Sequence, residues 1–184
     1  MKTTNFSIKN LREEDVLSPL DNEIRHLLCV CFPNDEAHFR QTRYWNEHKP
    51  AFVITLNSDA ELVGHVSLVE LSVSVGTYCL SVAALGCFAV KPTHQGRGLA
   101  SNLLNAFRNL SLEEKFDLGL LLCLPELEKV YAKAGWITLQ DRTLSLKTEN
   151  NAIEEYHGKN IAMWLPLVRT SLPEGDISIN KKEW

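Results

Sequence analysis

A glycine-containing segment, QGRGLA at residues 95–100, has the residue types of a phosphate-binding loop. An apolar segment ends before it at Val90, and Leu99, Leu103 and Phe107 follow it at helical spacing. The pattern predicts a strand, a glycine turn and a helix in succession. The first N–H groups of a helix lack acceptors within the helix, and the helix dipole is positive there. The segment is therefore typical of an anion site.

Two common phosphate-loop patterns do not fit this segment. A P-loop requires Lys followed by Ser or Thr after its last glycine, whereas Leu99 and Ala100 follow Gly98. A dinucleotide-binding fingerprint requires a third glycine, and this chain has Ser101 there, after a hairpin rather than a βαβ unit.

Tyr131 and Glu70 are side chains outside the loop that could transfer a proton. Tyr131 shares a helical spacing with Leu127 and Ala134, which also suits a tyrosine packed in a core. Glu70 falls on the strand face that we expect to be solvated. On the residues alone, Tyr131 is predicted to be a core tyrosine, and Glu70 fits a solvated strand position at least as well as a catalytic one.

The elements that position these residues predict an α+β fold, with a single domain over residues 1–184. We expect a mixed central sheet, an antiparallel meander followed by a β-α-β-α-β segment, with helices on both faces. The expected strands are Phe6–Leu11, Ala51–Leu56, Glu61–Val75, Tyr78–Val90, Phe116–Cys123, Trp136–Leu139 continuing at Thr143–Lys147, and Ile161–Val168. The expected helices are Pro19–Cys31, a short one ending at Phe39, Gly98–Leu112, and one that opens at Pro125 with Leu127, Val130, Tyr131 and Ala134 on its inner face.

Three other segments are predicted to lack regular structure. Thr42–Pro50 is either a substrate-side loop or a surface loop with packed aromatic residues. Thr148–Gly158 is predicted to be a polar loop, and the tail Thr170–Trp184 is predicted to be irregular. In the strand Glu61–Val75, the face predicted to point outward carries Gly64, Val66, Leu68, Glu70 and Ser72.

Composition narrows the class of protein. The chain has 184 residues, of which 45% are hydrophobic and 23% charged, the balance of a globular domain. The formal net charge of −4 argues against a nucleic-acid partner. The absence of a membrane-length apolar run or a secretory start predicts no membrane partner and a cytoplasmic location. Five cysteines without framework or zinc spacing predict reduced, buried thiols and no metal site.

The loop and its surroundings resemble the GNAT superfamily of N-acetyltransferases. The signature of that family is Gln or Arg, any two residues, Gly, any residue, and Gly or Ala, and residues 95–100 fit every position. Val90 and Pro92 precede the loop, and Tyr131 precedes Gly135 and Trp136, as in that family. The resemblance covers about Ala51 to Leu167.

The resemblance implies an N-acetyltransferase that uses acetyl-CoA as a co-substrate and needs no metal. Backbone groups of Phe88, Ala89 and Val90 would pair with the pantetheine arm like an added strand. The pyrophosphate would bind backbone N–H groups of the loop. These belong to Gln95, Gly96, Arg97, Gly98, Leu99 and Ala100.

The same resemblance implies a mechanism of direct attack by the acceptor amine. A bulge near Gly86 and Cys87 would open a cleft and offer a backbone N–H to the thioester carbonyl. Tyr131 would protonate the departing CoA thiolate as general acid. Many relatives carry a carboxylate on the central strand, where this chain has Gly86, so Glu70 is the nearest candidate for the general base.

The last third of the chain is similar to the aminoglycoside 2′-N-acetyltransferases. The segments VYAKAGW at 130–136, TLSL at 143–146 and WLPL at 164–167, and the tail to Trp184, carry this likeness. It implies that Asp35 and Trp184 bind a small-molecule amine, with an amino sugar or aminoglycoside as candidates. The nodulation N-acyltransferases are a second resemblance. Alternatives are N-acetylation of a protein or peptide amine, or a non-catalytic acyl-CoA-binding module. A homodimer is expected by analogy.

Overall fold

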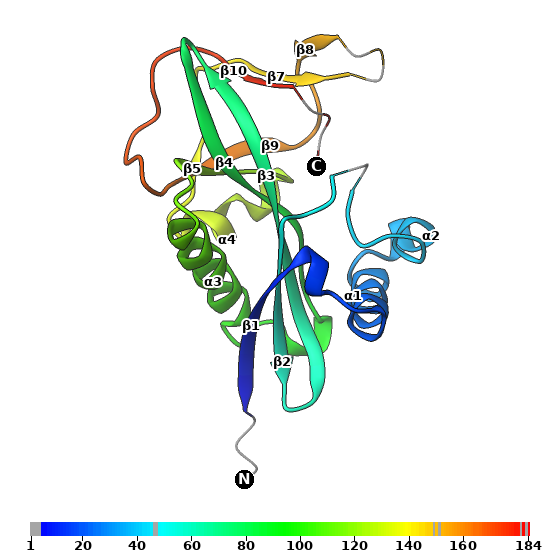
Figure 1. The fold of residues 1–184 in the computed structure, drawn as a ribbon. Helices are drawn as coiled ribbons and strands as arrows, with labels where there is room; N and C mark the ends of the chain where they lie inside the picture. The colour runs from blue at the N-terminus through cyan, green and yellow to red at the C-terminus, as the bar shows by residue number, and fades with distance from the viewer. Residues whose placement is uncertain (1–4, 46–47, 149, 151, 181, 183) are drawn as a thin grey trace. The chain divides into compact units, whose positions relative to one another are not determined.

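Ten strands form one mixed sheet in a computed structural model of the chain, which describes residues 5–45, 48–148, 150, 152–180, 182 and 184. The order is β6-β9-β5-β4-β3-β10-β7-β8, and β2 also pairs with β3 and carries β1 at its other edge (Figure 1). The strands are β1 Phe6–Arg12, β2 Phe52–Ser58, β3 Glu61–Val75, β4 Tyr78–Val90, β5 Leu118–Cys123, β6 Ile137–Thr138, β7 Leu144–Lys147, β8 Ile153–Glu155, β9 Ile161–Pro166 and β10 Ile177–Ile179.

Four α-helices accompany the sheet in the described residues, and a short 3₁₀ turn precedes each of them. The helices are α1 Ser18–Cys31, α2 Glu36–Phe39, α3 Leu99–Glu113 and α4 Glu128–Ala132. The 3₁₀ turns are η1 Glu13–Asp15, η2 Pro33–Asp35, η3 Pro92–His94 and η4 Pro125–Leu127. The mixed sheet and its helices confirm the predicted α+β class.

The chain forms two compact units, which share β3, β4 and α3 along the backbone. The first unit comprises Met1–Val69 and Gly86–Leu110. The second comprises Glu70–Leu85 and Ser111–Trp184. We describe each unit separately.

In the first unit, helices cover both faces of the strands, as predicted (Figure 1). Ile24, Leu27 and Leu28 recur at helical spacing on α1 and are buried in a cluster that includes Cys87 of β4. On the opposite face, an added Cβ at Gly64 of β3 would lie 2.8 Å from Leu103 Cδ1 of α3. The glycine therefore lets the helix approach the strand closely.

The face of β3 that was predicted to point outward is buried over the first part of the strand. Gly64, Val66 and Leu68 are buried rather than solvated, because α3 covers the face on which they lie. Only beyond Val69 does the strand alternate as expected, with Glu70 and Ser72 exposed. Alternation of polarity fails as a guide where both faces of a strand are covered.

In the second unit, β5 is buried between β4 and β9. It pairs in parallel with β4 over Leu118–Leu120 and antiparallel with β9 along its whole length. The strand predicted over 136–147 is two strands with different partners, β6 on β9 and β7 on β10 and β8. The break falls near Asp141, whose φ of +55° turns the chain.

Two segments predicted to be irregular contain strands. The loop 148–158 contains β8, which pairs with β7. The tail contains β10, which pairs antiparallel with β3 and parallel with β7. Strands of three residues are too short to show periodicity in the sequence, so their neighbours in the sheet decide whether they form.

The inner face predicted for the helix after Pro125 is wrong in part. Tyr131 is buried, but Leu127 and Val130 are exposed to about two fifths of their surface. The reason is that residues 125–127 form a 3₁₀ turn and α4 begins only at Glu128, so the side-chain directions differ from those of one continuous helix.

The cysteines are all free, but they are not all buried as predicted. Cys87 and Cys123 are buried, Cys29 and Cys31 are half-buried, and Cys79 is exposed. Within the described ranges, no group of His, Cys, Asp and Glu side chains is arranged to hold a metal ion. No described helix is both long enough and apolar enough to cross a bilayer.

Candidate acyl-CoA site

The glycine loop has the backbone shape of an anion cradle. It follows η3 and leads directly into α3, which begins at Leu99. Gly96 and Gly98 have φ of +75° and +78°, a conformation that costs an L-residue roughly 1–2 kcal/mol. The two glycines are therefore required by the backbone turn itself.

The loop leaves its N–H groups unpaired and its concave side open. Among the described residues, no protein acceptor bonds the backbone N–H groups from Gly96 to Ala100, and the first helical bond is Asn102 N to Gly98 O at 3.2 Å. A Cβ built on Gly96 or Gly98 would meet nothing within 4 Å. The Gln95 side chain donates to Val90 O at 3.0 Å and so ties the loop to the end of β4. A row of free donors at the N-terminus of a long helix suits a phosphate group.

The last residues of β4 direct their backbone groups alternately to its two edges. Lys91 N donates to Val63 O of β3 at 2.8 Å, so Lys91 and Ala89 face β3. Phe88 and Val90 therefore direct their N–H and C=O groups to the other edge. This alternation suits pairing with an extended polar chain through Phe88 and Val90, and it leaves Ala89 less suited than predicted.

The backbone of β4 is irregular at Cys87, one of the two residues near which a bulge was expected. Pairs between β4 and β5 end at Ala84 and Leu120, and Cys87 has φ of +46°, a left-handed value that is unusual for a residue with a side chain. Burial raises the pKa of the Cys87 thiol to about 12, against the opposing effects of the Trp45 backbone and the Ser67 hydroxyl. A protonated thiol is a poor nucleophile.

Tyr131 is buried on α4, in the second unit. Its ring makes an edge-to-face contact with Trp136, with 6.3 Å between ring centroids. Burial, and secondly Cys123, raise the pKa of the Tyr131 phenol well above its ordinary value. The phenol therefore stays protonated, as a general acid must.

The other predicted side chains lie in different surroundings. Glu70 is exposed on β3 in the second unit, and the described residues offer it no hydrogen bond or ion pair. Asp35 is exposed at the end of η2 in the first unit. Trp184 is buried in the second unit, and its indole Nε1 donates to Leu85 O on β4 at 3.1 Å. Trp184 thus contacts β4 two residues before Cys87.

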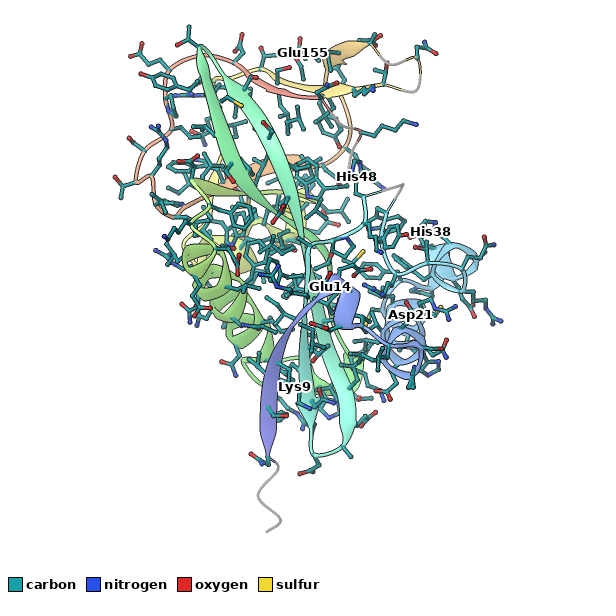
Figure 2. The ribbon with its side chains drawn as sticks, in the orientation of Figure 1. Lys9, Glu14, Asp21, His38, His48 and Glu155 are labelled. Carbon is teal, nitrogen blue, oxygen red and sulfur yellow. The ribbon has the colours of Figure 1, made fainter. Side chains whose placement is uncertain are left out.

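Sequence reasoning missed a buried polar group in the first unit, which we call the Arg43 cluster. Arg43 is paired there with Glu13 and Asp21, and its charge acts on the fully buried His65 of β3. Asp21 and Glu14, the exposed neighbour of Glu13, mark this region in Figure 2. The only sequence signal was the polar segment Thr42–Pro50, of which residues 46–47 lie outside the described residues.

The chain is similar to known acetyltransferases in sequence pattern and in fold. A family model described as acetyltransferase (GNAT) domain matches residues 8–138. No curated protein sequence matches the chain. The GNAT family N-acetyltransferase YhbS of Escherichia coli, solved in complex with CoA, superposes with a TM-score of 0.65 at 14% identity, covering 96% of this chain and 91% of that one.

Two further solved structures share the fold. The ribosomal-protein-S18-alanine N-acetyltransferase of Escherichia coli gives a TM-score of 0.57 at 17% identity, over 91% of this chain and 96% of that one. A GCN5-related N-acetyltransferase from Kribbella flavida gives 0.57 at 16% identity, over 74% of this chain and 34% of that one. This chain therefore spans only about a third of the Kribbella protein. At 14–17% sequence identity, these three similarities show a shared fold and nothing more specific.

Proposed function

Because this chain belongs to the GNAT acetyltransferase family, we propose that it transfers the acetyl group of acetyl-CoA to a primary amine of a small molecule, an amino sugar or aminoglycoside being the first candidate. The observation that carries the proposal is the row of unpaired N–H groups from Gly96 to Ala100 at the start of α3. These donors are fixed by the fold before any ligand binds, so binding a pyrophosphate there needs little reordering.

The residues present fit acetyl-CoA as a substrate. The free N–H groups and the open space at Gly96 and Gly98 suit the pyrophosphate, and Arg97 adds an exposed positive charge. The outward-directed backbone groups of Phe88, together with the N–H of Val90, suit the amide groups of the pantetheine arm. The irregular backbone at Cys87 offers an N–H to the thioester carbonyl oxygen.

In the proposed reaction, the acceptor nitrogen attacks the thioester carbonyl carbon and the carbon–sulfur bond breaks. Tyr131 donates its phenolic proton to the leaving sulfur, and takes a proton back from the nitrogen that has formed the new bond. A phenol of raised pKa suits this exchange, because it gives up its proton only as charge develops on sulfur. Glu70 is a candidate for the general base. Its side chain is exposed on β3, which equally suits a solvated surface residue.

An acceptor panel with acetyl-CoA tests the function directly. The panel contains kanamycin, glucosamine, 1,4-diaminobutane and a peptide with a free N-terminus, and CoA release is followed together with the mass of each product. We expect acetylation of at least one small amine, and an increase of the melting temperature on addition of acetyl-CoA. Acetylation of the peptide alone would favour the protein-amine alternative. A melting temperature that acetyl-CoA does not change would overturn the proposal.

Trp184 is proposed to line the acceptor side of this site, with its indole contact to Leu85 O as support. Trp184→Phe keeps an aromatic ring but removes the indole N–H. The lost hydrogen bond is worth about 0.5–1.5 kcal/mol of interaction free energy. We expect the KM for the acetylated amine to rise about 3- to 10-fold, while the KM for acetyl-CoA is unchanged. If the variant loses unfolding free energy but keeps the acceptor KM, the residue has a structural role alone.

A further inference from the structure

Strand β1 is the longest open edge of the sheet. Among the described residues, the sheet has three edge strands, and the other two, β6 and β8, have only two and three residues. β1 has seven residues, all paired with β2 and none with another strand (Figure 1). A long edge strand without proline or a bulge offers a full row of backbone groups to another chain.

The hydrogen bonds at the two ends of β1 show which of its residues face outward. Asp59 N donates to Asn5 O at 2.8 Å, and Glu13 N donates to Ala51 O at 2.9 Å. Because successive residues of a strand direct their backbone groups to opposite edges, the odd-numbered residues bond to β2. The even-numbered residues therefore face the open edge. Three of them have backbone N–H and C=O groups to which no described residue bonds: Phe6, Ile8 and Asn10.

The side chains of β1 are exposed on both faces of the strand. Phe6 and Ile8 are 37% and 39% exposed on one face. Ser7 and Lys9 are exposed on the other face, and Lys9 is labelled in Figure 2. A strand with exposed apolar side chains beside a row of free backbone groups is a site for the addition of another strand.

We propose that β1 forms the dimer interface of this protein, by pairing antiparallel with β1 of a second copy about a twofold axis at Ile8. The homodimer was expected by analogy alone, and this strand gives it a place in the fold. The proposal does not depend on the acetyltransferase function, because it uses only the edge of the sheet.

A second copy suits this edge because β1 is complementary to itself. Hydrogen-bonded pairs across the interface require outward-facing, even-numbered residues on both strands. When Ile8 lies opposite Ile8 of the second copy, Phe6 lies opposite Asn10, and each residue exchanges both backbone hydrogen bonds with the one opposite. The Phe6 and Ile8 side chains of both copies then adjoin on one face, so their exposed apolar surface is removed from water.

Charge favours this register over its two neighbours. A lysine on an edge strand discourages pairing, so Lys9 must lie opposite a residue that tolerates it. A twofold axis at Lys9 would place two lysines directly opposite each other, which destabilises a strand pair. An axis at Ile8 places Lys9 opposite Ser7 instead. An axis at Ser7 would also separate the lysines, but Asn10 would then extend beyond Asn5 of the second copy and lose its described partner.

The oligomeric state of the full chain in solution tests the proposal. Stable interfaces bury about 1,200–2,000 Å² in total, and one added strand pair provides less than this. We therefore expect a weak dimer, with a Kd on the order of 10–100 µM. Sedimentation velocity from about 5 to 500 µM protein, a range that brackets this constant, should show a shift from monomer to dimer.

Ile8→Pro is the decisive variant. The N–H of Ile8 faces the open edge, so proline there keeps the hydrogen bonds between β1 and β2 but removes a donor at the twofold axis. We expect the dimer Kd to rise at least about tenfold, while the increase of the melting temperature caused by acetyl-CoA is kept. Ile153→Lys, at an exposed isoleucine of the edge strand β8, is the control and should dimerise like wild type. If Ile8→Pro does not fold, Ile8→Lys should show the same loss, because it places like charges at the axis.

Ser7→Glu and Ser7→Lys test the register. In the proposed pairing, residue 7 of each copy faces Lys9 of the other, so glutamate should lower the Kd about three- to tenfold and lysine should raise it by a similar factor. With an axis at Lys9, residue 7 would face Leu11 and the two variants would have the same Kd. The proposal is overturned if the wild-type protein stays monomeric, if Ile8→Pro dimerises like wild type, or if the two Ser7 variants do not differ. None of these results depends on whether the protein acetylates an amine.

Discussion

Tyr131→Phe is expected to lower kcat by about 10²-fold, the lower end of what a general acid contributes. The variant removes only the hydroxyl and keeps the ring that packs on Trp136. The leaving CoA thiolate would then take its proton from water. The change in kcat and in kcat/KM should be similar, because the lost interaction belongs to the transition state.

Two controls separate this role from a structural one. Tyr78→Phe changes an exposed tyrosine whose ring stacks with Arg169, and it should leave kcat unchanged. The melting-temperature increase caused by acetyl-CoA should be the same in Tyr131→Phe as in wild type. If Tyr131→Phe keeps wild-type kcat, another group or water protonates the thiolate.

The raised pKa of Tyr131 also predicts how the wild-type kcat depends on pH under alkaline conditions. The general acid must be protonated, and a raised pKa keeps it so to a higher pH than the ordinary value of about 10. The wild-type kcat should therefore not fall between about pH 8 and pH 10 through loss of this proton. A fall with a midpoint well below that of free tyrosine would exclude Tyr131 as the acid.

Gly98→Asp is expected to weaken acetyl-CoA binding by at least about 10²-fold. The left-handed φ of +78° costs roughly 1–2 kcal/mol for a side chain. The space beside Gly98 is open, so the carboxylate would stand where the pyrophosphate is proposed to bind. Like charges in one site repel, and the repulsion adds to the backbone cost.

Gly98→Asn is the matched control for this charge. Asparagine has the same shape and tolerates the left-handed region, but it is neutral. Both variants should lose a similar free energy of unfolding, whereas the KM for acetyl-CoA should rise about tenfold more in the aspartate variant. Equal KM values in the two variants would mean that no anion binds beside Gly98.

Local patterns determined the elements that carry the glycine loop. Strands Glu61–Val75 and Tyr78–Val90 have the bounds that their β-forming residues and the turn at Gly76 and Thr77 predicted. The turn from β4 through Gly96 and Gly98 into α3 was also predictable, because the φ values and the free N–H groups depend on residues within one short segment. For the same reason, the residues of the loop were enough to relate it to a family.

Tertiary structure decided the features that join distant residues. Strand β10 forms because the edges of β3 and β7 supply its hydrogen-bond partners, and three residues carry no period of their own. The indole of Trp184 bonds to Leu85, 99 positions earlier in the chain. The left-handed conformation at Cys87, which follows Gly86, likewise depends on the packing around β4.

The sequence by itself thus determined the α+β class, the glycine loop proposed to bind an anion, and Tyr131 as a candidate acid, because each depends on neighbours along the chain. Only the fold brought Glu13, Arg43, His65 and Ser67 into one buried cluster. These residues come from three separate segments with no spacing in common, and taken singly each has the sequence context of an ordinary surface or strand residue. The ion pair of Glu13 with Arg43 and the burial of His65 and Ser67 are products of packing, which no local pattern in the sequence reveals.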